Sequence, residues 1–159
     1  MKIGSAAQDW RTHVLQDDAA IGRLIAAMRR IAVLGIKTEA QSNQPAFYVP
    51  AYLAAAGFDL VPVPVYYPQV QAILGRPVYR RIADIPERVD VVDVFRRPED
   101  LMSHLDDLLA ARPRAVWLQS GIRHDDFSRR LAEAGIDVVQ DRCLMVEHRL
   151  RGTSPVLAR

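Results

Sequence analysis

The chain has 159 residues, of which 50% are hydrophobic and 25% charged, as expected for one globular domain with a sizeable core. Its formal net charge of +2 is too small to indicate a nucleic-acid partner. A single cysteine, Cys143, excludes an intrachain disulfide framework and any multi-cysteine metal site.

The first 30 residues form an extension ahead of the first apolar run. The start of the extension lacks the apolar core of a signal peptide, so the simplest interpretation is a cytoplasmic protein. Its apolar residues Ile21, Leu24, Ile25 and Met28 are spaced as one face of a helix. The expected N-cap of this helix is Asp17 or Asp18. We expect this extension either to cap the sheet or to form a homodimer contact.

Short runs rich in Val, Ile and Leu recur along the rest of the chain. Their apolarity is nearly continuous rather than alternating, which is typical of parallel strands covered on both faces. The predicted strands are Ile31–Gly35, Asp59–Pro64, Val89–Phe95, Ala115–Gln119 and Asp137–Gln140. The longest mostly apolar run, residues 60–67, is too short to span a bilayer, so no membrane partner is expected.

Helical patterns separate most of these strands. Pro45 opens a helix that ends near Gly57, Pro98 stands at the first position of another, and Gly135 ends a third. The predicted apolar faces comprise Phe47, Tyr48, Tyr52, Leu53 and Ala56 in the first, Leu101, Leu105, Leu108 and Leu109 in the second, and Phe127 and Leu131 in the third. Residues 65–88 contain several prolines and are predicted to be a long crossover with one or two helical turns.

Strands that alternate with helices predict βαβ units joined by right-handed crossovers. The fold class is therefore α/β: a single Rossmann-like domain whose five-stranded, mainly parallel sheet carries helices on both faces. The expected strand order is 3-2-1-4-5. We divide the chain into a helical extension (1–30), the Rossmann-like domain (31–150) and a tail (151–159).

The end of the first strand predicts a binding site for an anion. The strand runs into Gly35, a polar loop follows, and Pro45 then opens a helix. This order places free backbone N–H groups and the positive end of a helix dipole beside the sheet, where a nucleotide phosphate is the natural ligand. The loop is not the G-x-G-x-x-G dinucleotide fingerprint.

Ligands of such sheets bind at the carboxyl ends of the strands, so the residues after each strand are the candidate site. The end of the second strand carries no acid to hold a ribose, which disfavours an ordinary NAD dehydrogenase. The candidate binding residues are Gly35, Ile36, Lys37, Thr38, Gln44, Pro45, Val65, Tyr66, Phe95, Arg96, Arg97, Gln119 and Gly121.

No convincing catalytic set emerges, so we do not expect an enzyme. Cys143 and His148 are five residues apart, which is poor helical spacing for a nucleophile and its base, and a buried structural thiol is favoured. The other histidines, His13, His104 and His124, are scattered along the sequence. For His104 and His124, a solvated helix face is the default interpretation. The acid pairs Asp106-Asp107 and Asp125-Asp126 are assigned to outer helix surfaces. No metal-ligand spacing is present.

Several segments together resemble those of a known family. They read Ile82-Ala83-Asp84-Ile85-Pro86-Glu87, Val89-Asp90-Val91-Val92-Asp93-Val94-Phe95-Arg96, Trp117-Leu118-Gln119-Ser120-Gly121-Ile122, and Asp141-Arg142-Cys143 followed by Glu147-His148. Over about residues 20–150 the chain resembles the small bacterial CoA-binding-domain proteins. These are stand-alone Rossmann modules similar to the CoA-binding domain of the succinyl-CoA synthetase alpha subunit.

The resemblance implies non-catalytic binding of CoA or an acyl-CoA, a small-molecule nucleotide ligand, at the carboxyl edge of the sheet. It assigns the phosphates to residues 35–38 and 44–46, and the nucleotide to residues 64–66. Residues 95–97 and 119–121 would close the other side. The first loop of the family usually consists of small residues, whereas this chain has the bulkier Ile36 and Lys37 there. The alternatives are a subunit or relative of an acyl-CoA synthetase and an NAD-type sensing module.

Overall fold

The computed structural model describes residues 9–151 and contains one parallel five-stranded sheet. Its strands are β1 (Arg30–Leu34), β2 (Asp59–Val63), β5 (Val91–Val94), β6 (Ala115–Leu118) and β7 (Asp137–Val139). The helices are α2 (Asp18–Ala27), α3 (Pro45–Ala55), α4 (Leu105–Ala111), α5 (Asp125–Glu133) and α6 (Leu144–Arg151). Short 3₁₀ segments are η1 (Asp9–His13), η2 (Glu39–Gln41), η3 (Ile82–Asp84) and η4 (Pro98–His104).

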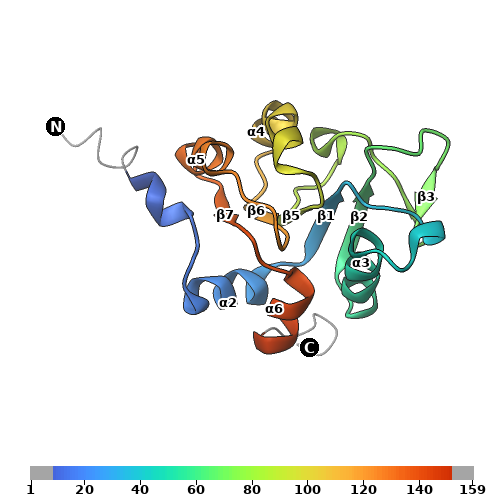
Figure 1. Cartoon of the computed structure of the whole chain (residues 1–159), viewed down its shortest axis with the longest axis horizontal. Helices are drawn as coiled ribbons and strands as arrows, with labels where there is room; N and C mark the ends of the chain where they lie inside the picture. The colour runs from blue at the N-terminus through green and yellow to red at the C-terminus, as the bar shows by residue number, and fades with distance from the viewer. Residues whose placement is uncertain (1–8, 152–159) are drawn as a thin grey trace.

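Two helical layers cover the sheet (Figure 1). One face packs against α2, α3 and α6, and the other against η4, α4 and α5. Residues in β1 alternate between them: Ile31 and Val33 belong to the first core, and Ala32 and Leu34 to the second. Both cores are apolar, which explains why the strand sequences are continuously apolar. The predicted α/β class with helices on both faces is confirmed.

The strand order is β2-β1-β5-β6-β7, which corrects one prediction. Counted along the chain this is 2-1-3-4-5, not 3-2-1-4-5. The third strand pairs with β1, with Ile31 opposite Val91, rather than with β2. Apolar runs alone do not specify which edge a returning strand joins. The direction of winding therefore reverses between β1 and β5, and this switch point is where such sheets bind ligands.

The helix signals fall where they were predicted. The Asp17 side chain accepts a hydrogen bond from Ala20 N at 3.0 Å and caps α2. Pro45 stands at the start of α3, and Pro98 at the start of η4. Because Pro98 opens a 3₁₀ segment, the helix expected there becomes fully α-helical only at Leu105.

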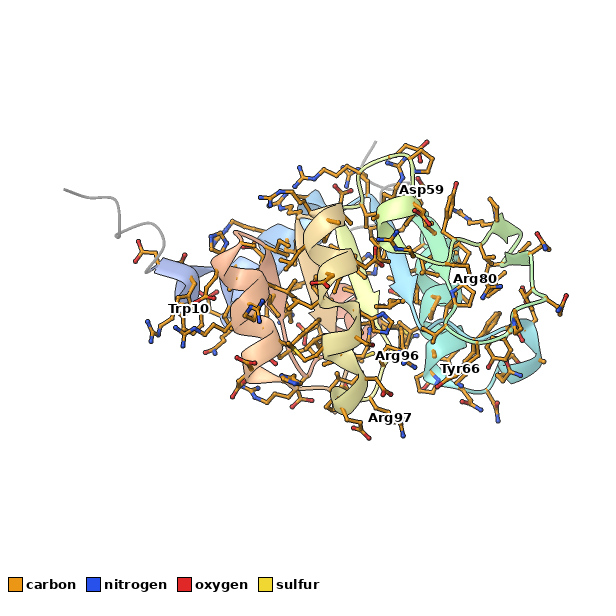
Figure 2. All side chains as sticks on the ribbon, turned by 90° about the horizontal axis from the view of Figure 1, so that it is seen from above. Trp10, Asp59, Tyr66, Arg80, Arg96 and Arg97 are labelled. Atoms are coloured by element: carbon orange, nitrogen blue, oxygen red, sulfur yellow. The ribbon has the colours of Figure 1, made fainter. Side chains whose placement is uncertain are left out.

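The crossover between β2 and β5 contains a helical turn as predicted, η3, and also a hairpin that was not predicted. It contains a two-stranded hairpin, β3 (Ala72–Ile73) with β4 (Arg76–Pro77), before η3. Arg80 then donates to four backbone carbonyl groups, those of Pro64, Tyr66, Tyr67 and Val70, at 2.9–3.5 Å. Arg80, labelled in Figure 2, therefore fixes the loop that follows β2.

The N-terminal extension is part of the fold. Ile21, Leu24 and Ile25 of α2 are buried in the first core. Val14 pairs with Val138, and Leu15 N donates to Val138 O at 2.8 Å, so residues 14–15 cover the β7 edge. Within residues 9–151 no helix has the length and apolarity needed to cross a membrane. The predicted tail falls on residues 152–159, outside the described residues.

Candidate functional site

The ends of β1 and β5 come unusually close at the switch point. Gly35 has a φ of +87°, and a Cβ atom there would lie 2.3 Å from the carbonyl oxygen of Phe95. Only glycine allows both the left-handed backbone and this approach. Gly35 therefore brings the loops after the two strands together.

A cavity of about 550 Å³ opens at this point, a volume typical of sites for small ligands. Its lining comes from the loop after β1, the first turns of α3, and the segments after β5, β6 and β7. The lining residues are Lys37, Gln44, Pro45, Ala46, Tyr48, Val49, Phe95, Arg96, Arg97, Pro98, Gln119, Ser120, Ile122 and Cys143. The wall thus combines apolar side chains with cations and amides.

The α3 N-terminus supplies one polar end of the cavity. Gln44 is its N-cap residue but makes no side-chain capping bond. Pro45 has no N–H, and the N–H groups of Phe47 and Tyr48 donate to Gln44 O, so the Ala46 N–H is the first-turn donor left for a ligand. Lys37 N donates to Ala46 O at 3.1 Å, which ties the loop to the helix. Within residues 9–151 no carboxylate lies within 4.0 Å of the Lys37 ammonium group. A free cation beside a helix N-terminus favours an anion.

Arg96 is held in place by neighbours from other elements. Its side chain is only 13% exposed. Nε donates to His104 Nε2 at 3.1 Å, and Nη1 donates to the Tyr66 hydroxyl at 3.4 Å. Burial and the Arg96 charge lower the pKa of His104, so the neutral ring accepts this bond. Figure 2 shows Arg96 close to Tyr66 at the carboxyl end of the sheet, opposite Asp59.

Arg97 is exposed and paired with acids. Its side chain is 69% exposed, and Nε donates to Asp100 Oδ2 at 2.9 Å. That hydrogen bond lowers the pKa of the Asp100 carboxyl group and raises the pKa of Arg97. Arg97 is therefore less available to a phosphate than Lys37, because a ligand would compete with a carboxylate already in place.

A buried acid lies beneath the cavity. The Asp93 side chain has no exposed surface, and its Oδ1 accepts a bond from Gln119 Nε2 at 2.6 Å. Burial raises the pKa of Asp93 to about 7, and the Gln119 bond only partly opposes this. Asp93 fixes the Gln119 amide, so the Gln119 carbonyl oxygen is left to accept a donor from a ligand.

The cavity brings together part of the predicted set and leaves part outside it. Lys37, Gln44, Pro45, Phe95, Arg96, Arg97 and Gln119 line it, whereas Gly35, Ile36, Thr38, Val65, Tyr66 and Gly121 do not. Ile36 is 1% exposed and belongs to the core, and Thr38 caps η2 with Gln41. Tyr66 is 58% exposed and lies beside Arg96.

Ala46 and Ser120 also line the cavity and belong to the segments 44–46 and 119–121 that the resemblance implied, and Pro98 and Cys143 follow predicted strands. Tyr48, Val49 and Ile122 line it without having been predicted. Tyr48 was placed on the buried face of its helix, but it is 42% exposed. Its position four residues after Gln44 puts it on the face of the helix start, a signal that could have found it. Cys143 is half-buried against the first core and also reaches the cavity.

The histidines discussed here contact structural partners and do not line the cavity themselves. His148 Nδ1 lies 2.8 Å from the Tyr52 hydroxyl, and His124 caps α5 by accepting from Phe127 N. His104 bonds Arg96 instead of lying on the solvated face expected for it. Within residues 9–151 no three His, Cys, Asp or Glu side chains come together as a metal site. None of the described histidines lines the cavity.

The family model described as "CoA binding domain" matches residues 29–149, including every segment that lines this cavity. The chain belongs to the CoA-binding-domain family. Its membership confirms the resemblance inferred from the sequence segments.

Individual relatives of this CoA-binding-domain chain cover most of its length. The uncharacterized protein YneT of Bacillus subtilis is 28% identical over 130 residues, which are 82% of this chain and 93% of YneT. A Thermus thermophilus structure is 44% identical with a TM-score of 0.77, covering 85% of this chain and 98% of its own. A Pyrococcus horikoshii OT3 structure is 29% identical with a TM-score of 0.76, covering 86% and 92%.

A much longer enzyme contains the same fold. The dinucleotide-forming acetyl-coenzyme A synthetase 1 of Ca. Korarchaeum cryptofilum matches with a TM-score of 0.62 at 20% identity. The match covers 74% of this chain but only 26% of the synthetase chain. At this identity the likeness concerns the fold alone.

Proposed function

We propose that the cavity at the ends of β1 and β5 binds CoA or an acyl-CoA without catalysing a reaction on it. The observation that carries this proposal is the Lys37 ammonium group, unpaired among residues 9–151, which shares the cavity with the α3 N-terminus at the switch point of a CoA-binding-domain fold. Phosphate groups of the ligand would lie at this end. Their charge is complementary to both features.

The rest of the wall suits the less polar part of CoA. Val49, Phe95 and Ile122 supply apolar surface, and Gln119 offers an amide oxygen held in place by Asp93. The arm of CoA carries amide N–H groups between apolar segments, which matches one acceptor among apolar side chains. The ligand would therefore run from Lys37 toward Gln119.

An NAD-type ligand and an acyl-CoA synthetase role are the alternatives. Neither the second-strand acid nor the glycine-rich loop of an NAD site is present in this sequence. The synthetase chain that shares the fold is far longer than this one, so a synthetase role would require a partner subunit. Copurification of such a partner would favour that role over a stand-alone binding protein.

Calorimetric titration of the full chain with CoA, acetyl-CoA, NAD and NADP tests the ligand class. We expect binding of CoA or acetyl-CoA, with NAD and NADP at least about tenfold weaker, which corresponds to 1.4 kcal/mol. Binding of NAD in preference to both CoA species would favour the sensing module. Absence of heat with either CoA species would refute the proposed function.

A further inference from the structure

A second cavity lies at the far edge of the sheet, between η1, the start of α5 and the end of β7. Its volume is about 470 Å³, and it shares no lining residue with the cavity described above. Figure 2 shows Trp10 beside α5, at the opposite side of the molecule from Tyr66 and Arg80. Trp10 and Arg11, which line this second cavity, precede the family match at residues 29–149. The domain shared with the family therefore does not account for this cavity.

Three guanidinium groups from different segments converge on this cavity. Arg11 and Arg129 lie over the Trp10 ring, with Cζ atoms 4.6 and 4.9 Å from its centroid, and Arg123 lines the wall. The Trp10 ring face attracts cations and so holds two of them together. An oxyanion placed between them would relieve their mutual repulsion.

Carboxylates compensate these charges only in part. Arg123 Nε lies 3.4 Å from Asp125 Oδ1, and Arg129 Nε donates to Glu133 Oε2 at 3.0 Å. Asp125 also lines the cavity, and it is 81% exposed. Among the described residues, Arg11 has no carboxylate within 4.0 Å.

A buried hydroxyl group points independently to a ligand. Ser128 is 1% exposed and lines the cavity, and its Oγ has no hydrogen-bond partner in the described part of the chain. Buried polar groups in folded proteins are nearly always paired. Gln140 in the same wall is already engaged, since Oε1 accepts from His124 N at 2.8 Å. The Ser128 hydroxyl group is thus an unused hydrogen-bond donor in a cavity lined by arginines.

We propose that this cavity binds a small organic phosphate, with its oxyanion held by Arg11, Arg129 and Ser128. Guanidinium forks and a hydroxyl donor are the groups that recognise phosphate oxygens. An adjoining hollow of about 360 Å³ shares Gln16 and Arg123 and adds both Asp141 and Arg142, so the site has room beyond a single phosphate group. This site is separate from the CoA cavity and does not depend on it.

Titration of the full chain with pyrophosphate, followed by calorimetry, tests the proposal. Arg129→Gln should weaken binding about tenfold. Arg130→Gln is the matched control, because it removes the same charge from the next position of α5, outside the cavity wall. It should change the affinity less than about twofold. Arg11→Gln should reproduce the effect of Arg129→Gln from a different element.

Lys37→Gln separates this site from the other cavity. If pyrophosphate binds at Arg11 and Arg129, the Lys37 variant keeps the wild-type affinity. Loss of pyrophosphate binding in Lys37→Gln, equal losses in Arg129→Gln and Arg130→Gln, or no binding by the wild-type protein would each overturn the proposal.

Discussion

At the scale of single residues, Gly35 has the most demanding environment in the site. Its φ is +87°, and an added Cβ would lie 2.3 Å from the Phe95 carbonyl oxygen. Gly135 also has a positive φ, of +83°, but a Cβ there would meet nothing within 4 Å. Substitution of Gly135 would therefore introduce backbone strain alone, whereas substitution of Gly35 would add a steric clash to the same strain.

We expect Gly35→Ala to lower the free energy of unfolding by about 3 kcal/mol or more, and Gly135→Ala by about 1 kcal/mol. The difference arises because only Gly35→Ala forces the ends of β1 and β5 apart. Urea denaturation of both variants checks this. Equal losses would show that the close approach to Phe95 has no energetic consequence.

Asp93 predicts a pH dependence of stability. Its pKa is raised from 3.8 to about 7 in the folded chain, so between these values the folded state holds a proton that the unfolded state has lost. The free energy of unfolding should therefore fall as pH rises from about 4 to 7, by up to about 1.4 kcal/mol per pH unit from this group.

Asp93→Asn should remove this contribution, because the amide cannot ionise and keeps an oxygen that accepts from Gln119. Urea denaturation from pH 5 to pH 8 should show a shallower fall of stability in the variant than in the wild-type protein. Parallel pH profiles for the two proteins would mean that Asp93 is ionised in the folded state throughout this range.

At the scale of elements, one acid of a pair caps a neighbouring segment. Asp106-Asp107 was assigned to an outer helix surface, but the Asp107 side chain is only 14% exposed. Its carboxylate oxygens accept from Ile82 N and Ala83 N, both at 2.8 Å. Asp107 thus satisfies the open N-terminus of η3 and ties the crossover to α4.

We expect Asp107→Ala to destabilise the protein by about 2 kcal/mol, because it leaves two N–H groups without their acceptor. Asp106→Ala is the control, since Asp106 is exposed on the same helix, and it should cost less than about 0.5 kcal/mol. Thermal unfolding of both variants distinguishes them. A similar loss in the two would contradict the capping role of Asp107.

Much of the element pattern could be predicted because its determinants are local. Asp17, Pro45 and Pro98 each mark the element start they were expected to mark. The Asp107 cap could not be predicted, since its partners are 24 and 25 residues away in sequence. The same holds for the strand order, which depends on pairing between β1 and β5 rather than on any one segment.

At the scale of the whole molecule, the sheet edge was predictable and its detailed lining was not. Lys37, Phe95 and Gln119 follow strands and therefore reach the carboxyl edge. Arg97 follows a strand too, yet nearby acids pair with it. Tyr48 lies within a helix and enters the cavity through the orientation of α3. Side-chain pairing and helix placement are tertiary properties that strand-end position does not encode.

Lys37 carries the electrostatic part of the proposed binding. Lys37→Gln should weaken CoA binding about tenfold, because it removes a cation with no competing carboxylate. Arg23→Gln makes the same change in charge at an exposed position of α2, outside the cavity, and should leave the affinity within about twofold. Calorimetry on both variants checks this, and comparable losses would indicate non-specific attraction.

A crystal structure of the protein in complex with CoA tests the central claim most directly, because it locates the ligand. The account predicts CoA in the cavity at the carboxyl ends of β1 and β5, with phosphate oxygens at the Lys37 ammonium group and the first turn of α3. The arm of CoA should then pass Phe95 toward Gln119. Density for CoA elsewhere, with this cavity unoccupied at saturating ligand, would contradict it.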